Sequence, residues 1–340
     1  MSHKELKGLI NMSHGSGGRA MAELIESLFV KHFDNSLLRQ GNDFAAFNVD
    51  KGRMVMSTDS HVVSPLFFPG GDIGSLAVHG TLNDIAMSGA RPLYLSAGFI
   101  LEEGFPLKKL EKIVISMAHA AKHAGVAIVC GDTKVVEQGK GDGVFINTTG
   151  VGVVPKGVEP SGNKARPCDR ILINGPIGDH GIAVLSKREH LEFETAVESD
   201  SAALHTLVAD MVTAVPDIHC LRDPTRGGLA TTLNELAQQS GVGICLQEQA
   251  IPIHAEVNAA CELLGLDPLY IANEGKLVAI CAQQHADNLL SVMRDHPLGK
   301  EAAIIGEVVE DEHQMVEMET RFGGRRVVDW MAGEPLPRIC

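Results

Sequence analysis

Five aspartates stand beside glycines or other small residues in the 340-residue sequence: Asp43 in GND, Asp59 in STDS, Asp84 in LNDIAMSGA, Asp132 in CGDT and Asp223 in RDPTRGG. Carboxylate oxygens are the hard ligands that Mg²⁺ prefers, and nucleotide phosphates often complete its coordination. One aspartate alone is more often a cap or a turn former. Five of them beside glycine-rich loops favour a magnesium and nucleotide site.

The segment HGSGGR contains Gly15, Ser16, Gly17 and Gly18 immediately before a stretch with helical spacing. Without Cβ atoms, consecutive backbone N–H groups can converge on an anion, and a helix N-terminus adds a favourable dipole. The segment matches neither the P-loop nor the dinucleotide-binding pattern. It predicts a phosphate-binding loop, and the alternative is a flexible N-terminal loop.

A second anion-binding segment is DPTRGGL, where Thr225, Arg226, Gly227 and Gly228 precede a helical pattern. Backbone donors, a guanidinium and a hydroxyl at a helix start suit phosphate. The alternative is an Asp-Pro turn that leads into an ordinary helix.

Two further side chains are candidates for catalysis. Lys134 in GDTKVV is followed by apolar β-branched residues and could clamp a phosphate oxygen, although a surface lysine is the commoner case. Glu274 in NEGKLV stands at a turn before an apolar strand, where it could serve as a base or be a plain turn residue.

The sequence ends on Cys340, within GEPLPRIC. None of the 7 cysteines forms a C-x-x-C pair, and Cys130, Cys245 and Cys281 lie in apolar runs that indicate core positions. Two prolines favour an extended arm, which could reach about 25 Å from Gly333. This pattern predicts a projecting thiol and a reducing compartment.

The composition excludes several classes of protein. A formal net charge of −14 argues against a reader of the nucleic-acid backbone and against an anionic membrane surface. No apolar run approaches the roughly 20 residues that span a bilayer, and the first residues lack a signal-peptide pattern. We therefore expect a cytoplasmic protein.

Strand-like and helix-like patterns alternate along the chain, which predicts an α/β fold. The expected strands are 53–59, 93–101, 126–132, 143–154, 170–178, 242–248, 276–282 and 302–309. The expected helices are 72–89, 107–125, 205–215, 227–241, 254–265 and 284–295. A Pro-, Gly- and Lys-rich stretch near 155–168 then predicts a boundary between two domains, at 1–155 and 156–332, followed by a tail at 333–340.

Taken in order, HGSGGR, STDS, LNDIAMSGA, GDTKVV, DPTRGGL, NEGKLV and the terminal PRIC resemble the HypE family of hydrogenase maturation factors. This family lies in the superfamily of aminoimidazole ribonucleotide synthetase, selenophosphate synthetase and thiamine-monophosphate kinase. The internal motifs are shared in part by the superfamily, and the PRIC ending selects the family. The likeness runs from residue 14 to the C-terminus.

The resemblance implies a two-domain synthetase-type fold, with ATP binding and dimerisation assigned to residues 1–155 and an α/β domain at 156–332. The N-terminal sheet would pair with that of a second subunit in a barrel-like homodimer core, and the C-terminal domain would be an α/β sandwich. ATP and Mg²⁺ would lie between the domains. By position, Asp43, Asp59, Asp84 and Asp223 would bind the metal, and Asp132, Thr133 and the two glycine-rich segments would bind the nucleotide. Superfamily relatives often have G-D-D where this chain has Gly41-Asn42-Asp43, so only Asp43 is assigned there.

The resemblance also implies a reaction. The partner HypF would place a carbamoyl group on Cys340, and ATP-dependent loss of water would leave a thiocyanate. The cyanide would pass to iron on a HypC–HypD complex. Phosphorylation turns a poor leaving oxygen into phosphate, with Lys134 neutralising charge and Glu274 and Asp84 handling protons. The alternatives are a phosphotransfer enzyme for a free small molecule and a non-catalytic docking protein.

Overall fold

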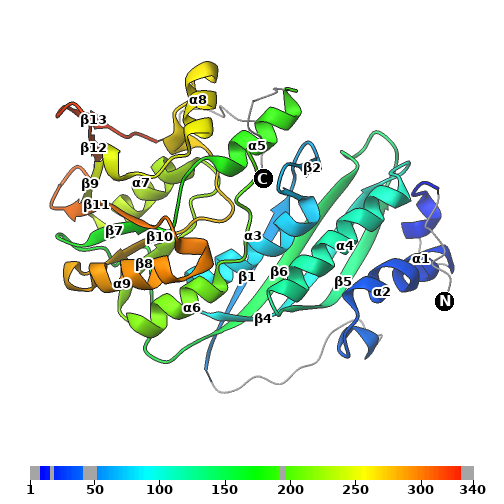
Figure 1. Ribbon diagram of the computed structural model, residues 1–340. Helices are drawn as coiled ribbons and strands as arrows, with labels where there is room; N and C mark the ends of the chain where they lie inside the picture. The colour runs from blue at the N-terminus through cyan, green and yellow to red at the C-terminus, as the bar shows by residue number, and fades with distance from the viewer. Residues whose placement is uncertain (1–7, 16–18, 41–51, 191–196, 331–340) are drawn as a thin grey trace.

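The computed structural model describes residues 8–15, 19–40, 52–190 and 197–330 (Figure 1). The N-terminal half contains α1 (Arg19–Leu24), α2 (Lys31–Phe33), β1 (Arg53–His61), β2 (Phe67–Phe68), β3 (Gly71–Asp72), α3 (Ile73–Met87), β4 (Arg91–Glu102), α4 (Leu107–His123), β5 (Ala127–Val136) and β6 (Val144–Val154). The C-terminal half contains β7 (Arg170–Ile173), α5 (Asp179–Arg188), α6 (His205–Ala214), β8 (Ile218–Arg222), α7 (Gly228–Ser240), β9 (Gly243–Gln247), α8 (Ala255–Leu264), β10 (Val278–Cys281), α9 (Gln283–Asp295), β11 (Ala303–Val309), β12 (Val316–Glu319) and β13 (Arg325–Val327). Short 3-10 turns and a π-helical segment (Ile25–Val30) complete the described elements.

The N-terminal half is built on a four-stranded sheet in the order β1-β6-β4-β5. Alternate residues of β1 are exposed and half-buried, as expected for a strand with one covered face. Helices α3 and α4 lie over one face of this sheet (Figure 1). Leu76, Leu110 and Ile146 are among the buried side chains of the core between them.

The other face of the four-stranded sheet carries apolar side chains that the described chain leaves in contact with solvent. Met54, Met56 and Ile100 are 45%, 73% and 45% exposed. Several exposed apolar side chains on one sheet face are typical of a surface that pairs with another molecule.

The C-terminal half is built on a seven-stranded sheet in the order β13-β12-β9-β11-β7-β10-β8. Successive residues of β7 and β10 point to opposite faces: Leu172 and Ala279 pack with α6 and α9, and Ile171 and Ile280 pack with α7. The sheet is therefore a central layer between helices, which is why its strands are nearly continuous hydrophobic runs.

Helix α3 joins the two halves. It starts where Asp72 accepts hydrogen bonds from the main-chain N–H groups of Gly74 and Ser75, an arrangement that caps the helix. It ends before Gly89, whose φ of +73° suits glycine. Ile85 and Met87 near its C-terminus pack into the same core as α6 and α9, so α3 contributes to both cores.

The structure extends or shortens several predicted elements. The strands expected to end at Asp59 and Asp132 continue to His61 in β1 and to Val136 in β5. The strand expected over 170–178 ends at Ile173, because the following NGPIG segment leads into α5, which the sequence did not predict. Cys245 and Cys281 are buried as predicted, whereas Cys130 is only half-buried. No helix of the described residues is long and apolar enough to cross a membrane.

Asn83 ties α3 to the C-terminal half. Its Nδ2 donates to the main-chain oxygens of Ala202 and Glu274 at 3.0 and 3.1 Å, and its Oδ1 accepts from the N–H of Leu204 at 2.8 Å. The side chain is 2% exposed. Buried polar groups that lose such partners keep their desolvation cost.

We predict that Asn83→Ala lowers the free energy of unfolding by roughly 2–3 kcal/mol, because three buried main-chain groups lose their partner. Urea unfolding followed by circular dichroism measures the change. Asn258→Ala is the control: this asparagine is exposed, and its side chain donates to Glu262 within α8. The control should change stability by no more than about 0.5 kcal/mol, and equal effects of the two substitutions would contradict the prediction.

Candidate functional site

Four carboxyl groups gather where the two halves meet. Asp59 comes from β1, Asp84 from α3, Asp223 from the turn after β8, and Glu274 from the loop before β10. Asp84 Oδ2 accepts a hydrogen bond of 2.6 Å from Ser57 Oγ on β1. The charges of Asp59, Asp84 and Asp223 all act on Glu274. The structure therefore brings together four of the carboxylates that the sequence singled out, from elements far apart in the chain.

The shared site raises the pKa of three of these groups. Burial raises the pKa of Asp84, with a further contribution from the charge of Asp59, against the opposing hydrogen bond from Ser57. Burial and the charge of Asp84 raise the pKa of Asp223 to about 7. Burial, followed by the charges of Asp223 and Asp200, raises the pKa of Glu274 well above its usual range. Such a cluster attracts protons or a cation, and perturbed carboxyls of this kind are frequent in active sites.

The donor set suits a hard divalent cation. The groups are carboxylates at a half-buried junction, and oxygen donors are what Mg²⁺ prefers. Among the described residues no three metal-ligating side chains are close enough to chelate an ion alone. This arrangement fits a Mg²⁺ that takes its remaining ligands from phosphate oxygens and water.

His61 is a member of the site that sequence reasoning missed. It ends β1, is 3% exposed, and its Nε2 lies 3.6 Å from Asp59 Oδ2 and 3.3 Å from Thr148 Oγ1. Burial lowers the pKa of His61, with the charge of Asp59 opposing and that of Arg226 assisting. The ring is therefore neutral near pH 7 and supplies a hydrogen-bonding group. His61 lies two residues after Asp59, and residues two apart on a strand share one face. This spacing in the sequence could have indicated that the two side chains are neighbours.

The segment 223–228 forms a tight turn at the start of α7. Gly227 and Gly228 have φ of +76° and +60°, and a Cβ on Gly228 would lie 2.6 Å from the main-chain oxygens of Leu269 and Ile271. The Gly228 N–H donates to the oxygen of Thr225 at 3.0 Å, while Arg226 is exposed. The predicted helix start is thus present beside the carboxylates. Its role in nucleotide binding stays a prediction.

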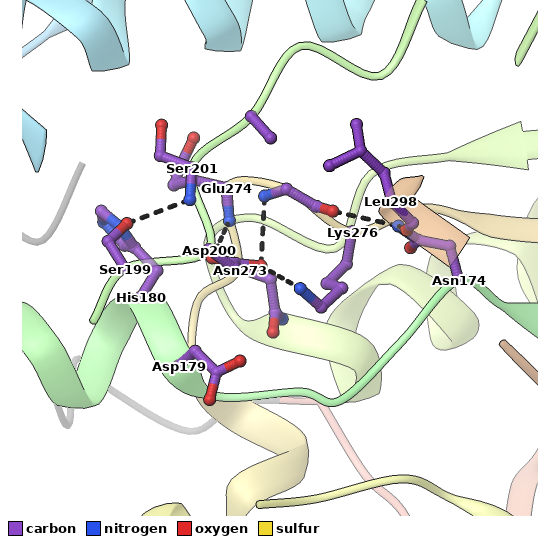
Figure 2. A network of polar contacts seen from close by, with 12 residues as sticks. Asn174, Asp179, His180, Ser199, Asp200, Ser201, Asn273, Glu274, Lys276 and Leu298 are labelled. Carbon is purple, nitrogen blue, oxygen red and sulfur yellow. Dashed lines mark hydrogen bonds and ion pairs between the residues drawn. The ribbon is translucent and has the colours of Figure 1, made fainter. Parts of the chain in front are cut away.

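A polar network surrounds the main chain next to Glu274 (Figure 2). Asn273 Nδ2 donates to the oxygen of Pro224 at 2.9 Å, and its Oδ1 accepts from the N–H of Gly178 at 2.8 Å. Asp200 and Lys276 belong to the same network. These residues could not be recognised from sequence patterns, because their partners come from separate segments.

Lys134 and Asp132 lie elsewhere. Their side chains are 64% and 62% exposed, and Lys134 Nζ lies 2.9 Å from Asp132 Oδ2. Side-chain bonding to Lys134 lowers the pKa of Asp132. The strand register pairs Lys134 with Ile100 and Asp132 with Gly98, whereas Asp59 pairs with Thr148, which is buried beneath α3. Since strand residues alternate in direction, the Lys134–Asp132 pair is on the free face of the sheet, opposite the carboxylates.

On that free face, Asp132 and Lys134 line an open cavity of about 520 Å³ together with Ser60, Gly98, Ile100, Phe145 and Asn147. Thr133 points the other way: it is 4% exposed, and its N–H donates to Asp132 Oδ1 at 2.9 Å. Within one chain, Lys134 and the carboxylates are therefore separate.

Several predicted site residues lie outside the described residues: Ser16, Gly17, Gly18, Asp43 and Cys340. Gly15 ends a short 3-10 turn. His14 in that turn accepts a hydrogen bond on its Nδ1 from the N–H of Asn11 at 3.1 Å, which indicates a local structural role.

Comparisons with known proteins identify the family and the fold. Residues 41–154 match the AIR synthase related protein N-terminal domain, and residues 166–319 match the corresponding C-terminal domain. Carbamoyl dehydratase HypE of Cupriavidus necator is 69% identical over 334 residues, which cover 98% of this chain and 95% of the relative. These domain matches confirm the predicted α/β synthetase-type fold.

Two solved structures extend the likeness. HypE in complex with ATP superposes with a TM-score of 0.94 at 52% identity, covering 97% of this chain and 99% of that one. A chain of the HypE–HypF complex superposes with a TM-score of 0.81 at 50% identity, covering 91% and 99%.

The raised pKa of Asp223 predicts how stability changes with pH. In the unfolded chain this carboxyl ionises near pH 4, whereas in the folded protein its pKa is about 7. Between these values the folded state keeps a proton that the unfolded state has lost, so stability falls as the pH rises. Asp223→Asn removes the ionisable group, and its stability relative to the wild type should therefore rise from about pH 5 to about pH 8.

Urea unfolding at several pH values, without nucleotide or divalent cation, measures this difference. Asp210→Asn is the control, because Asp210 is exposed on α6. The control should follow the wild type at each pH. A difference between Asp223→Asn and the wild type that stays constant with pH would refute the assignment.

Proposed function

The chain belongs to the HypE family of carbamoyl dehydratases, and on that basis we propose that it uses ATP to dehydrate a carbamoyl group carried on its own Cys340 thiol. The product is a thiocyanate whose cyanide becomes a ligand of the iron in [NiFe] hydrogenase. The observation that carries the proposal is the cluster of Asp59, Asp84, Asp223 and Glu274, in which burial and mutual repulsion raise the pKa of three groups.

The reaction needs an activated oxygen and the loss of two protons. The carbamoyl group on sulfur is S–C(=O)–NH₂, and its oxygen is a very poor leaving group. Transfer of the ATP γ-phosphoryl to this oxygen, with loss of one N–H proton, gives S–C(OPO₃)=NH and ADP. Loss of the second N–H proton expels phosphate and forms S–C≡N. The balance is one ATP and one S-carbamoyl group in, and one thiocyanate, ADP, phosphate and the two nitrogen protons out.

The carboxylates have two proposed roles, and Asp84 is a candidate for both. Asp59, Asp84 and Asp223, with Asp43 outside the described residues, would hold Mg²⁺, which neutralises phosphate charge when bound. Glu274 would accept protons from the carbamoyl nitrogen, with Asp84 as a second acceptor. A buried carboxylate with a raised pKa is a stronger base than one in water, which suits this role.

The glycine-rich segments would hold the nucleotide. The proposed contacts are Gly15, Ser16, Gly17 and Gly18 near the N-terminus, Thr225, Arg226, Gly227 and Gly228 at the start of α7, and Asp132 and Thr133 on β5. The N-terminus of α7 beside the exposed Arg226 is the feature that supports phosphate binding at this turn.

The proposal includes partners. The carbamoyltransferase HypF would load Cys340, and a HypC–HypD complex would receive the cyanide. The exposed apolar face of the four-stranded sheet, with Met54, Met56 and Ile100, supports a homodimer in which a second sheet covers it. Lys134 on that face would then lie near the subunit interface, where it would bind phosphate. Free thiols, including exposed Cys168, support a reducing cytoplasmic setting.

We predict that the C-terminal peptide gains one carbamoyl mass when the protein is incubated with HypF, carbamoyl phosphate and the ATP that HypF requires, and then loses one water when further Mg-ATP is added. Intact-protein and peptide mass spectrometry follow both changes. Cys340→Ala should abolish both. Cys168→Ser is the control, because Cys168 is an exposed thiol outside the tail. Cyanide formation by Cys340→Ala would eliminate the carrier role, and ATP turnover indifferent to Cys340 would favour a free small-molecule substrate.

A second prediction separates loading from dehydration. Glu274→Gln should load normally but lose water about 10² to 10⁴ times more slowly, because it cannot accept the nitrogen proton. Single-turnover mass spectrometry on preloaded protein measures this rate. Glu256→Gln on the first turn of α8 is the control, since Glu256 is exposed. An unchanged dehydration rate in Glu274→Gln would exclude Glu274 as the base.

A further inference from the structure

Residues 199–204, which we call the strap, lie between the two halves. The Ser199 N–H donates to the oxygen of Pro69 at 2.9 Å, and Ser201 Oγ is 2.9 Å from His79 Nδ1 on α3. The Leu204 N–H donates to Asn83 Oδ1. The strap thus belongs to the C-terminal half in sequence and is bonded along its length to the N-terminal half.

The strap also holds the main chain of Glu274. The Glu274 N–H donates to Asp200 Oδ1 at 3.0 Å. The Glu274 oxygen accepts from Asn83 Nδ2 at 3.1 Å and from the Ala202 N–H at 3.4 Å. Both main-chain polar groups of this residue are therefore bonded to the strap or to α3.

The next residue is held by the same carboxylate. The Gly275 N–H donates to Asp200 Oδ2 at 3.1 Å, so the two oxygens of Asp200 accept from two consecutive N–H groups (Figure 2). A Cβ on Gly275 would lie 1.8 Å from the main-chain oxygen of Asp200. Only glycine permits this approach, because no other residue lacks a Cβ.

Lys276 stabilises the buried carboxylate of Asp200. Its Nζ lies 3.0 Å from Asp200 Oδ2, and the two side chains are 10% and 4% exposed. A buried carboxylate without a cation is strongly unfavourable. Burial alone would raise the pKa of Asp200, but the charges of Lys276 and His180 and the Glu274 N–H outweigh it and lower the pKa.

We propose that Asp200, paired with Lys276, is the positioning residue for the proposed base Glu274. Asp200 accepts hydrogen bonds from the N–H groups of Glu274 and Gly275, and so fixes the orientation of the Glu274 side chain toward the carboxylate cluster. Proton transfer requires a donor and an acceptor at hydrogen-bond distance, and a displacement of about 1 Å costs up to about 100-fold in rate. The inference rests on the proposed function, because it assigns Asp200 to the dehydration step.

The strap contains its own control. Ser201 lies one residue from Asp200, but its hydroxyl bonds to His79 Nδ1, whereas the Glu274 N–H bonds to Asp200. Ser201→Ala therefore removes a contact of the strap and leaves the hydrogen bonds between Asp200 and the Glu274 loop in place. Asp200→Asn keeps the shape, but its amide nitrogen cannot accept one of the two N–H bonds, and Lys276 loses its counter-charge.

Two measurements test the proposal on the full-length protein preloaded with the carbamoyl group. In hydrogen exchange, the amides of Glu274 and Gly275 should exchange about tenfold faster or more in Asp200→Asn, and at the wild-type rate in Ser201→Ala. In single turnover, Asp200→Asn should lose water about 100-fold more slowly, with the KM for ATP within about twofold of the wild type. Loading of Cys340 should be unchanged.

Lys276→Gln is the second variant, for the case in which Asp200→Asn does not fold. It keeps both acceptor oxygens and removes the cation, so faster exchange at residues 274–275 and slower dehydration are expected again. Unchanged dehydration in the folded variants, or a loss shared equally with Ser201→Ala, would overturn the proposal. So would a rise in the KM for ATP that accounts for the whole loss. Wild-type protein that does not dehydrate its carbamoyl group would end the proposed function instead, and the exchange data would still decide whether Asp200 holds the loop.

Discussion

Repulsion among carboxyl groups is the constraint on which the site depends. Asp59, Asp84, Asp223 and Glu274 share a junction at which burial raises the pKa of the last three, and the charge of Asp59 adds to each of these increases. A fold retains so unfavourable a group of charges only if the surrounding structure compensates for it and function requires it. Here the compensation is mechanical: the backbone around the cluster is fixed by Asn83, Asp200 and Asn273, whose hydrogen bonds join segments far apart in the sequence.

Helix α3 contributes to this fixed backbone through two adjacent rows of residues. His79 and Asn83 are one turn apart and bind the strap, while Gly80 and Asp84 are one turn apart and face β1. Gly80 lets the strand come close, since a Cβ there would lie 2.9 Å from the His61 ring and 3.4 Å from Asp59. The helix therefore sets the separation of the two halves and the placement of Asp84 through the same few residues. Movement of one half against the other would change the geometry of the cluster directly.

Local patterns allowed part of this to be predicted. Hydrophobic periodicity located α3 and α4, Asp72 and Gly89 marked the limits of α3, and the small residues around Asp84 made that aspartate conspicuous. Asp200 gave no such signal, because its role depends on Glu274, Gly275 and Lys276, more than seventy residues away. The face of the sheet on which Lys134 lies could not be predicted either, because the register of β5 is decided by its pairing with β4 rather than by its own sequence.

The placement of Lys134 limits how it can take part in catalysis. Its ammonium is bound to Asp132 on an exposed surface, and ion pairs of this kind contribute at most about 1 kcal/mol. A phosphate group carries more charge and more acceptor oxygens than one carboxylate, so it would displace Asp132 readily once water was excluded. The free face of the sheet is open in the single chain, and exclusion of water there requires a covering surface. A second sheet packed against Met54, Met56 and Ile100 would provide it, so that dimerisation would convert a weak surface pair into a phosphate-binding cation.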